Sequence, residues 1–314
     1  KLNSNYYPVM VESLNNYHFT EARGYSSDYL DSDHGKESLE DILYNRFKEA
    51  RERIIPWLDS TRKLSNLNII EVGCGSGTGT IPFAEQVNSV IALDIDPEIL
   101  KVCKDRCELL NIQNVDYHCM ELGEYVQSVN ANIDAVIFYA TLEQMPIDQR
   151  VSALKSAWEI LPDGGLIIII DTPNSLFYFD GHTSGLPFHH WITDELAYRY
   201  VEVMPSSIFR SEQFDGEITK SKMDEFIGWG RSISYHDLEI SFKKLNSSFK
   251  ILKSLSSYEN EIYFYENKLT SIYRKIRFKN ESVTDRYMNL MIEYQPEINP
   301  SFFHPYLNII IEKS

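Results

Sequence analysis

The chain has 314 residues, 43% of them hydrophobic and 13% aromatic, which is enough apolar material for one large domain or two modest ones. It has 46 Asp and Glu against 30 Lys and Arg, and the resulting formal charge of −16 repels nucleic-acid phosphates and anionic lipids. No apolar run approaches the ~18 residues that a membrane span needs. We therefore expect a cytoplasmic protein with neither nucleic acid nor membrane as a partner.

The first predicted element is a helix over residues 38–59. Charged residues separate apolar side chains that recur at helical spacing, namely Leu39, Ile42, Leu43, Phe47 and Ile54. This helix precedes the core, and we assign residues 1–60 to an N-terminal helical cap segment.

Apolar strands and helices then alternate along the chain. The predicted strands are NLNIIEV (66–72), SVIALDI (89–95), VDYHCM (115–120), IDAVIFYA (133–140) and GLIIIID (165–171). The predicted helices cover residues 78–88, 97–111 and 148–161. Continuous apolar strands separated by helices indicate βαβ units and a parallel sheet covered on both faces.

After about residue 174 the pattern changes to loops and helices rich in Tyr and Phe. Two apolar runs, FKILKSL (249–255) and YLNIIIEK (306–313), are predicted as late strands of the sheet. An insertion over about residues 257–300 lies between them and is too long for bare loop. It is expected to hold two cap helices, ENEIYFYENKLTSIYRKIRF (259–278) and DRYMNLMIEY (285–294).

These elements predict a doubly wound α/β fold with a mostly parallel, seven-stranded sheet and a helical cap built from the N-terminal segment and the C-terminal insertions. The core is expected over residues 61–205. Residues 206–314 are expected to supply the late strands and the insertion.

The four cysteines are Cys74, Cys103, Cys107 and Cys119. Two of them are spaced CxxxC, but no second pair of Cys or His ligands follows at a matching spacing, as a zinc site requires. We expect buried, reduced thiols, and we predict no metal site.

The stretch EVGCGSGTGT (71–80) follows the first predicted strand directly. A dinucleotide-binding turn requires GxGxxG, but the third position falls on Thr78 or Thr80 in the two possible registers. A Walker phosphate loop requires a lysine, which this stretch lacks. Both observations disfavour an NAD-dependent oxidoreductase or a nucleotide triphosphatase.

An acidic residue followed by GxGxG, here Glu71 with Gly73, Gly75 and Gly77, resembles the first motif of the class I S-adenosylmethionine-dependent methyltransferases. Four later segments resemble the family's motifs in order: VIALDIDPE with Asp94, YHCMELGEY with Glu121, FYATLEQMP, and LPDGGLIIIID. The resemblance covers roughly residues 60–172, and it implies S-adenosylmethionine as cofactor and S-adenosylhomocysteine as product.

The resemblance also implies roles for residues. The glycines would let the methionine moiety lie against bare backbone, and Glu71 would order the turn or bind the ammonium group through water. Asp94 would accept the ribose hydroxyls, whereas Asp96, directly before Pro97, is better explained as a helix cap. Glu121 would accept from the adenine amino group. Further contacts to the cofactor are assigned to Ile95, Met120, Leu122 and Tyr139.

The acceptor should meet residues that follow the fourth and fifth strands. These are TLEQM (141–145), where Gln144 replaces a histidine common in the family, and TPNSLFYFDGHTSGLPFHHW (172–191). Methyl transfer to a hydroxyl gains from a general base. His182 is the leading candidate, followed by His189, His190 and His236, although histidines in polar loops are often structural. The spacing does not support a metal held by Asp171, Asn174 and His182.

The segment over residues 172–191 resembles one found in bacterial methyltransferases that act on sugars or other polar metabolites. We therefore predict O-methylation of a hydroxyl on a small-molecule or glycan acceptor. The alternatives are a non-catalytic methyltransferase-fold binding protein, an NAD-dependent oxidoreductase and a protein-methylating enzyme. The sequence leaves the acceptor and the oligomeric state open.

Overall fold

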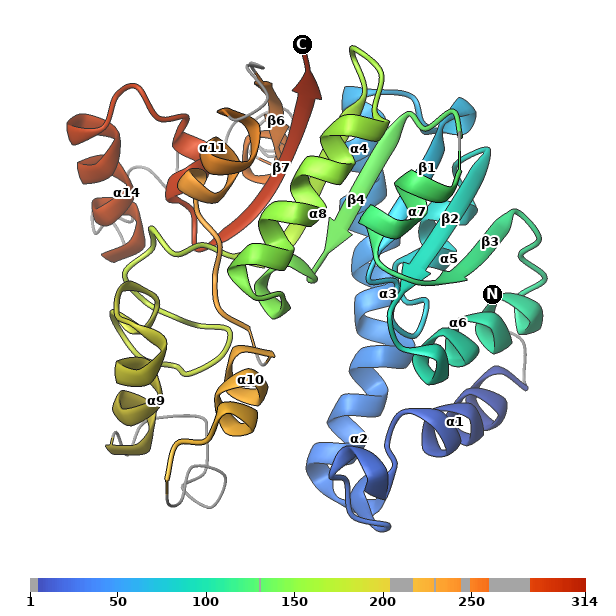
Figure 1. Ribbon diagram of the computed structural model, residues 1–314. Coiled ribbons are helices and arrows are strands. Elements are labelled where there is room, and N and C mark those ends of the chain that lie inside the picture. The colour runs from blue at the N-terminus through green and yellow to red at the C-terminus, as the bar shows by residue number, and fades with distance from the viewer. Residues whose placement is uncertain (1–4, 130, 204–216, 229, 244–248, 260–282) are drawn as a thin grey trace, which may run out of the picture. The chain divides into compact units, whose positions relative to one another are not determined.

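The computed structural model describes residues 5–129, 131–203, 217–228, 230–243, 249–259 and 283–314 (Figure 1). Within these residues, seven strands form one sheet in the order β3-β2-β1-β4-β5-β7-β6. The strands are β1 Asn68–Val72, β2 Ser89–Asp94, β3 Val115–Cys119, β4 Ala135–Tyr139, β5 Leu166–Pro173, β6 Phe249–Ser254 and β7 Tyr306–Lys313.

Strands β1 to β4 run parallel, with Val72 paired to Leu93 and to Phe138, and Asp94 paired to Cys119. Strand β7 runs in the opposite direction to β5. The Lys313 N–H donates to Gly165 O at 2.9 Å, and the Asn174 N–H donates to Pro305 O at 2.9 Å. The predicted doubly wound, mostly parallel sheet is confirmed, and its late strands lie where the two late apolar runs were predicted.

The α-helices of the described residues are α1 Tyr6–Tyr17, α2 Asp33–Glu40, α3 Arg46–Glu49, α4 Ile55–Thr61, α5 Thr80–Ala84, α6 Pro97–Leu109, α7 Leu122–Ser128, α8 Ile147–Ile160, α9 Asp194–Val203, α10 Lys220–Gly228, α11 Tyr235–Lys243 and α14 Val283–Tyr294. Helices α4 and α7 cover opposite faces of the sheet in Figure 1. Helix α14 confirms the second helix of the predicted insertion. The first, over residues 259–278, lies outside the described residues except for its first position.

The predicted helix over residues 38–59 is part of a helical run that continues from α2 through α3 to α4. Two segments of this run, Asp41–Asn45 and Ala50–Ile54, are π-helical. Most of the predicted apolar face is buried: Leu39, Leu43, Phe47 and Ile54. The sequence analysis did not identify α1, which packs against α6 with Tyr6, Met10 and Leu14 in a shared apolar cluster.

The chain divides into two compact units. Unit 1 comprises Lys1–Tyr139, Ser156–Ile167 and Lys313, and unit 2 comprises Ala140–Lys155, Ile168–Glu312 and Ser314. Unit 1 contains strands β1 to β4. Unit 2 contains an apolar cluster formed by Leu186, Ala197, Tyr198, Val201 and Phe226. The predicted boundaries at residues 60 and 205 stay a prediction.

Three of the four cysteines are buried, as expected. Cys74, Cys103 and Cys107 lie with Phe47 and Leu100 in one apolar cluster of unit 1. Cys119 is exposed, contrary to the expectation, because it ends β3 at the edge of the sheet rather than pointing into this cluster.

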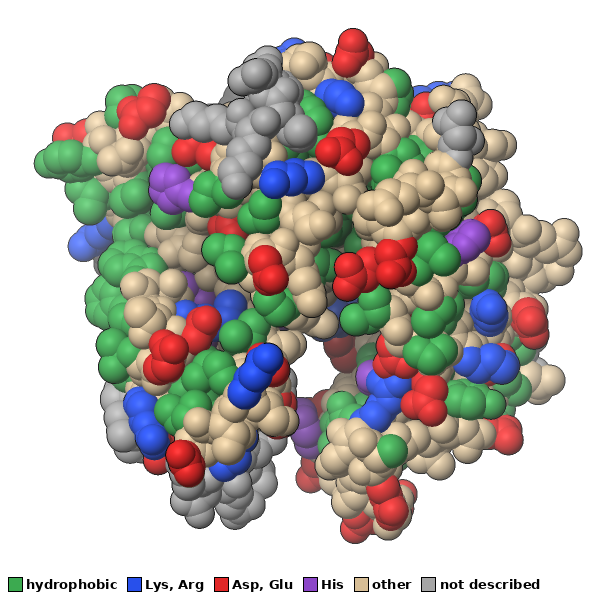
Figure 2. All heavy atoms as spheres, in the orientation of Figure 1, with side chains coloured by type: hydrophobic (Ala, Val, Ile, Leu, Met, Phe, Trp, Pro, Cys, Tyr) green, Lys and Arg blue, Asp and Glu red, His purple; other side chains and the backbone are tan. Residues whose placement is uncertain are grey.

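The surface shows mixed charge. On the face drawn in Figure 2, Lys and Arg side chains lie among Asp and Glu side chains rather than in a separate field. Among the described residues, no helix has both the length and the apolar character needed to cross a bilayer.

A substitution at Gly77 tests how tightly the turn after β1 packs on α6. Its φ is +81°, and a Cβ would lie 2.8 Å from Cys103 Sγ and 3.2 Å from Cys103 Cα. Gly77→Ala should therefore lower the free energy of unfolding by about 2–4 kcal/mol, through both the left-handed backbone and the overpacking. Gly75→Ala is the matched control, since Gly75 has φ +52° and no atom within 4 Å of the Cβ position.

The control should lose only about 1–2 kcal/mol, the cost of the backbone alone. Urea unfolding of both variants measures the difference. Equal losses would mean that the approach of the turn to Cys103 is not tight.

Candidate functional site

The turn after β1 holds three glycines in the left-handed region, with φ of 70° at Gly73, 52° at Gly75 and 81° at Gly77. Its backbone is tied to the end of β2, because the N–H groups of Gly73 and Cys74 both donate to Leu93 O, at 2.8 and 3.0 Å. The alternating glycines thus let the chain leave β1 and turn toward the end of β2 through left-handed backbone, which residues with a side chain rarely adopt.

Asp94 ends β2 beside this turn. Its Oδ2 accepts from the Gly75 N–H at 2.8 Å and its Oδ1 from the Asp96 N–H at 3.0 Å. A carboxylate offers about four lone-pair sites, so acceptor capacity remains for the two hydroxyls of a ribose. Burial raises the pKa of Asp94, and the backbone hydrogen bonds oppose that rise. Asp96 caps α6 by accepting from the N–H groups of Glu98 and Ile99, so the prediction of a cap is confirmed.

Glu71 is buried under the turn, with 2% of its surface exposed. Its Oε2 accepts from the Thr80 hydroxyl at 2.6 Å, and burial raises its pKa to about 8. A Cβ added to Gly79 would lie 2.6 Å from Glu71 Oε1 and 3.0 Å from Tyr139 Cδ1. These contacts favour the predicted role of ordering the turn over that of binding an ammonium group.

The remaining residues assigned to the cofactor lie at the same edge, because the parallel strands end together there. Ile95 is 70% exposed, which is unusual for isoleucine and leaves an apolar surface beside Asp94. Glu121 is exposed at the N-cap of α7 and makes no side-chain cap bond. Leu122, in contrast, is 2% exposed and packs inward. Ile95 and Glu121 are therefore more accessible to a ligand than Leu122.

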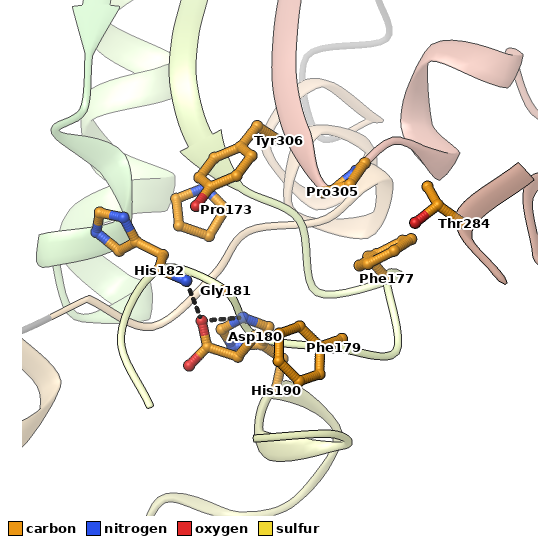
Figure 3. A pocket seen from close by; sticks show the side chains of 10 residues that line it. All are labelled: Pro173, Phe177, Phe179, Asp180, Gly181, His182, His190, Thr284, Pro305 and Tyr306. Carbon is orange, nitrogen blue, oxygen red and sulfur yellow. Dashed lines mark hydrogen bonds and ion pairs between the residues drawn. The ribbon is translucent and has the colours of Figure 1, made fainter. Parts of the chain in front are cut away.

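Unit 2 contains a cavity of about 210 Å³ formed by the loop after β5 and the start of β7 (Figure 3). Aromatic and apolar side chains supply most of its wall, and the polar side chains there include Asp180, His182 and His190. The lining residues are Pro173, Phe177, Phe179, Asp180, Gly181, His182, His190, Thr284, Pro305 and Tyr306.

The four candidate histidines have different environments. His182 is half-buried, lines the cavity and contacts the Tyr306 ring edge-on, with the ring centroids 6.2 Å apart. His190 lines the same cavity. His189 is 0% exposed and burial lowers its pKa, whereas the His236 side chain is 61% exposed and lies 3.5 Å from Glu239. The cavity therefore includes two of the predicted bases, His182 and His190.

The sequence analysis did not single out two titratable groups of unit 2, Tyr306 and Glu143. Tyr306 lines the cavity, and burial together with the carboxylates of Asp171, Asp180 and Glu143 raises its pKa to about 12. Glu143 is 0% exposed, and burial raises its pKa to about 8. The only signal was its place in TLEQM, where the family resemblance points to Gln144 instead.

The side chain of Asn174, which was considered as a metal ligand, has a structural role. Its amide nitrogen donates to Phe302 O at 2.5 Å and His304 O at 2.7 Å, and its amide oxygen accepts from the Leu176 N–H at 3.0 Å. These bonds join the loop after β5 to the segment that leads into β7. The Asn174 amide therefore stabilises the backbone of both segments.

The glycine turn, its acidic neighbours and the strand order together fit one family. Residues 69–165 match the family described as a methyltransferase domain. This stretch is a class I S-adenosylmethionine-dependent methyltransferase domain. S-adenosylmethionine is the methyl donor in this family.

Curated proteins that resemble this chain include methyltransferases of two kinds. The tRNA 5-carboxymethoxyuridine methyltransferase of Escherichia coli (strain K12) is 26% identical over 163 residues, which are 50% of this chain and 58% of that protein. The ubiquinone biosynthesis O-methyltransferase of Xylella fastidiosa (strain M23) is 26% identical over 125 residues, 40% of this chain and 50% of that protein. The chain thus spans about half the length of these relatives.

Among solved structures, an S-adenosylmethionine-dependent methyltransferase from Clostridium acetobutylicum ATCC 824 superposes with a TM-score of 0.37 and 16% identity, covering 44% of this chain and 57% of that chain.

Asp94→Ala tests the predicted contact of Asp94 with the ribose of the donor. Removing two charge-assisted hydrogen bonds, each worth about 1.5–3 kcal/mol, should weaken S-adenosylmethionine binding by at least about 100-fold in calorimetry. Asp96→Ala is the control, since it removes the cap of α6. It should lower stability by about 1 kcal/mol and change affinity only a few-fold. Unchanged affinity in Asp94→Ala would contradict the assignment.

Glu71→Gln tests the buried carboxyl. Because folding raises the pKa of Glu71 to about 8, the unfolded chain ionises first as the pH rises. Wild-type stability should therefore fall between about pH 4.5 and 8, by up to about 1.4 kcal/mol per pH unit from this group. Glu71→Gln keeps an acceptor for Thr80 and cannot ionise, so urea unfolding at pH 5 and 8 should show a shallower decline. The same decline in both proteins would mean that Glu71 is ionised when folded.

Proposed function

We propose that this protein transfers the methyl group of S-adenosylmethionine to a hydroxyl of a sugar or another polar small molecule. The observation that carries the proposal is the donor geometry in unit 1, where Asp94 keeps free acceptor capacity beside a bare glycine turn within a methyltransferase domain. The nature of the acceptor is inferred separately, from the cavity of unit 2.

At the donor site, the residues of the chain would bind and orient S-adenosylmethionine. The turn around Gly75 offers backbone surface to the methionine moiety, Asp94 would accept from the ribose hydroxyls, and Glu121 and Ile95 would meet the adenine. Glu71 acts from beneath, since its hydrogen bond from Thr80 ties β1 to the first turn of α5. S-adenosylmethionine supplies the electrophilic methyl group when bound.

The cavity of unit 2 suits a small acceptor with both apolar and polar faces. The rings of Phe177, Phe179 and Tyr306 offer flat apolar surface, while His182 and His190 offer polar atoms. Its volume, about 210 Å³, lies below the roughly 300–1,000 Å³ of pockets for drug-sized ligands. A single ring bearing hydroxyls fits this volume better than a whole nucleotide.

The chemistry requires alignment and a proton acceptor. The acceptor oxygen attacks the methyl carbon in line with the departing sulfur, the C–S bond breaks, and its electron pair stays on the sulfur of S-adenosylhomocysteine. The hydroxyl proton must leave as the O–C bond forms, which makes a neighbouring neutral histidine useful. His182 and His190, the two histidines that line the cavity, are side chains that can act as such a base.

A nucleic-acid acceptor is the main competing possibility, because several of the relatives are tRNA methyltransferases. The formal charge of −16 and the interspersed charges of Figure 2 weigh against it. A methyltransferase-fold binding protein without turnover and an NAD-dependent oxidoreductase are two further possibilities, and threonine at both third-glycine positions disfavours the oxidoreductase.

A screen for the release of S-adenosylhomocysteine tests the proposal. The full chain is incubated with S-adenosylmethionine and with sugars, nucleotide sugars, other hydroxyl-bearing metabolites or bulk tRNA. We expect release only with a hydroxyl-bearing small molecule, whose mass increases by one methylene, and loss of release in Asp94→Ala. Release with tRNA alone would overturn the acceptor assignment. Donor binding without release would favour a binding protein, and binding of NADH instead would favour an oxidoreductase.

A further inference from the structure

Three aromatic side chains line the cavity of unit 2 in Figure 3. Phe177 and Phe179 come from the loop after β5, and Tyr306 comes from the start of β7. The ring of Phe177 is packed edge-on against the ring of Tyr287, with the centroids 5.3 Å apart. The face of an aromatic ring attracts a cation that lies within about 6 Å of the ring centre. Three rings around one small space therefore favour a compact cation.

Gly181 keeps the space between two of these rings open. A Cβ at this position would lie 3.9 Å from Phe179 Cε1 and 4.0 Å from Tyr306 Oη. An alanine methyl group would thus make ordinary van der Waals contacts, whereas a longer side chain would fill the space between the two walls. Gly181 itself lines the cavity, so a substitution here changes the room that a ligand has.

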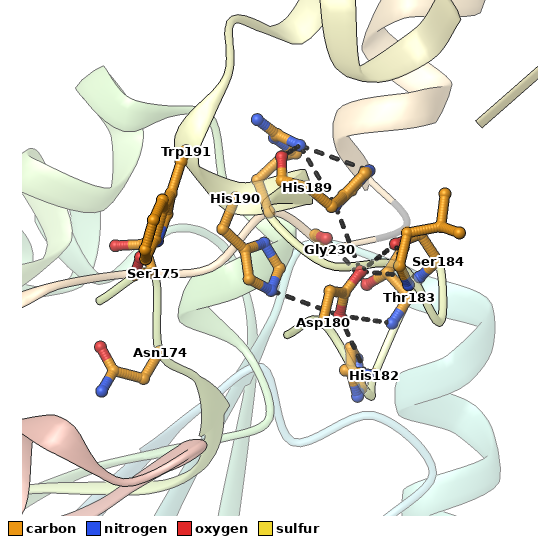
Figure 4. Close-up of polar contacts among 12 residues, drawn as sticks. Asn174, Ser175, Asp180, His182, Thr183, Ser184, His189, His190, Trp191 and Gly230 are labelled. Atoms are coloured by element: carbon orange, nitrogen blue, oxygen red, sulfur yellow. Dashed lines mark hydrogen bonds and ion pairs between the residues drawn. The ribbon is translucent and has the colours of Figure 1, made fainter. Parts of the chain in front are cut away.

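A buried carboxylate also lines the cavity. Asp180 is 1% exposed and is the centre of the hydrogen-bond network in Figure 4. Its Oδ1 accepts from the N–H groups of His182 and Thr183 at 2.9 and 3.0 Å. Its Oδ2 accepts from the Ser184 N–H and hydroxyl, both at 2.7 Å. Four donors within five residues of chain thus hold the carboxylate in one orientation.

The two histidines beside Asp180 stabilise its charge without cancelling it. His189 Nδ1 lies 3.2 Å from Oδ2 and His190 Nε2 lies 3.3 Å from Oδ1. Burial alone would raise the pKa of Asp180, but these contacts outweigh burial and hold that pKa well below its usual range. Burial lowers the pKa of His189. A proton on His190 Nδ1 would have no acceptor among the described residues, so the neutral ring, with its proton on Nε2, is favoured.

The groups around the cavity leave it with a negative potential. Those described residues that line it include neither Lys nor Arg. Arg231, which lies near the network, forms an ion pair with Asp194 at 2.9 Å. Burial and the charges of Asp171 and Asp180 raise the pKa of Tyr306 to about 12, as expected for a hydroxyl near anions. A cationic ligand is therefore attracted to this cavity and an anionic ligand is repelled.

The hydrogen bonds of Asp180 indicate which kind of cation suits the cavity. One ligand atom each from Asp180, His189 and His190 lies within 4.8 Å of the others, a spacing that could hold a metal ion. However, the four hydrogen bonds to the carboxylate already use about as many lone-pair sites as it offers. A metal ion or a primary ammonium group binds such oxygens directly. An alkylated ammonium group needs only aromatic faces and a negative potential.

We propose that the cavity of unit 2 binds an alkylated ammonium group, and that the acceptor is a small hydroxyl-bearing amine. Phe177, Phe179 and Tyr306 would surround the ammonium group, and the buried charge of Asp180 would attract it across the cavity. The role of this ligand as the acceptor rests on the proposed function. Binding of the ammonium group is a property of unit 2 alone and requires no methyl donor.

Two probes of the same shape test the preference for charge. Choline and 3,3-dimethylbutan-1-ol differ in that only choline carries a positive charge. Ligand-observed NMR titrations with the full chain, without donor, give the Kd of each. Choline should bind at least about tenfold more tightly, and equal or tighter binding of the alcohol would overturn the proposal. Ethanolamine, a primary amine, should bind more weakly than choline. The reverse order would contradict the preference for an alkylated ammonium group.

Substitutions place the binding in this cavity. Gly181→Leu should weaken choline binding at least about tenfold, since the side chain fills the space between Phe179 and Tyr306, and Gly181→Ala is the matched control with a small effect. Circular dichroism reports whether each variant folds. A folded Gly181→Leu with the wild-type affinity would place choline elsewhere and overturn the proposal.

A second pair of variants tests the aromatic wall without filling the cavity. Tyr306→Phe keeps the ring, whereas Tyr306→Leu removes it. Tyr306→Phe should therefore bind choline at least about threefold more tightly than Tyr306→Leu, while the two bind the neutral alcohol equally. Equal affinities for choline would overturn the role of the ring.

The acceptor screen separates this inference from the proposed function. We expect release of S-adenosylhomocysteine with hydroxyl-bearing amines. Release with uncharged hydroxyl compounds alone, by a protein that does not bind choline, would overturn the ammonium site and leave the proposed function standing. Choline binding without release from any acceptor would instead overturn the proposed function and leave the ammonium site standing.

Discussion

The proposed donor site depends on one contact, the hydrogen bond from the Gly75 N–H to the carboxylate of Asp94. A glycine-rich turn has many accessible conformations, and this bond fixes one of them against the end of the neighbouring strand. The same carboxylate accepts from Asp96, which in turn caps α6. The Asp94 side chain therefore fixes the backbone of the turn relative to the end of β2 and to the residue that caps α6. Its oxygens can still accept further hydrogen bonds from a ligand.

The core strands could be predicted because a parallel sheet buried on both faces needs nearly continuous apolar runs. Helix ends were harder to predict. The helix expected over residues 78–88 is Thr80–Ala84, although the Glu85 and Val87 N–H groups still donate four residues back. Helix α1 was missed because few of its residues are buried, namely Tyr6, Met10, Ser13 and Leu14, and its partner α6 lies far along the chain.

The two halves of the candidate site differ in how well a sequence reveals them. The residues proposed for the donor are marked locally in the sequence, since left-handed backbone favours glycine and an acid that ends the second strand is typical of a ribose contact. The cavity of unit 2 is specified by contacts between distant segments. Tyr306 meets His182 across more than a hundred residues of chain, and no local pattern announces such a contact. Likewise, the stretch DGHTSG indicates a turn at Asp180. It does not indicate that the side chains of His189 and His190 lie beside the Asp180 carboxylate.

The buried carboxyls also bear on the electrical behaviour of the whole molecule. A formal charge of −16 counts each Asp and Glu as ionised. Folding raises the pKa of Glu71 and of Glu143 to about 8, so near neutrality both carry protons that the open chain would have released. The folded protein therefore migrates in an electric field as a weaker anion than its composition suggests, and unfolding it at neutral pH liberates protons into the buffer.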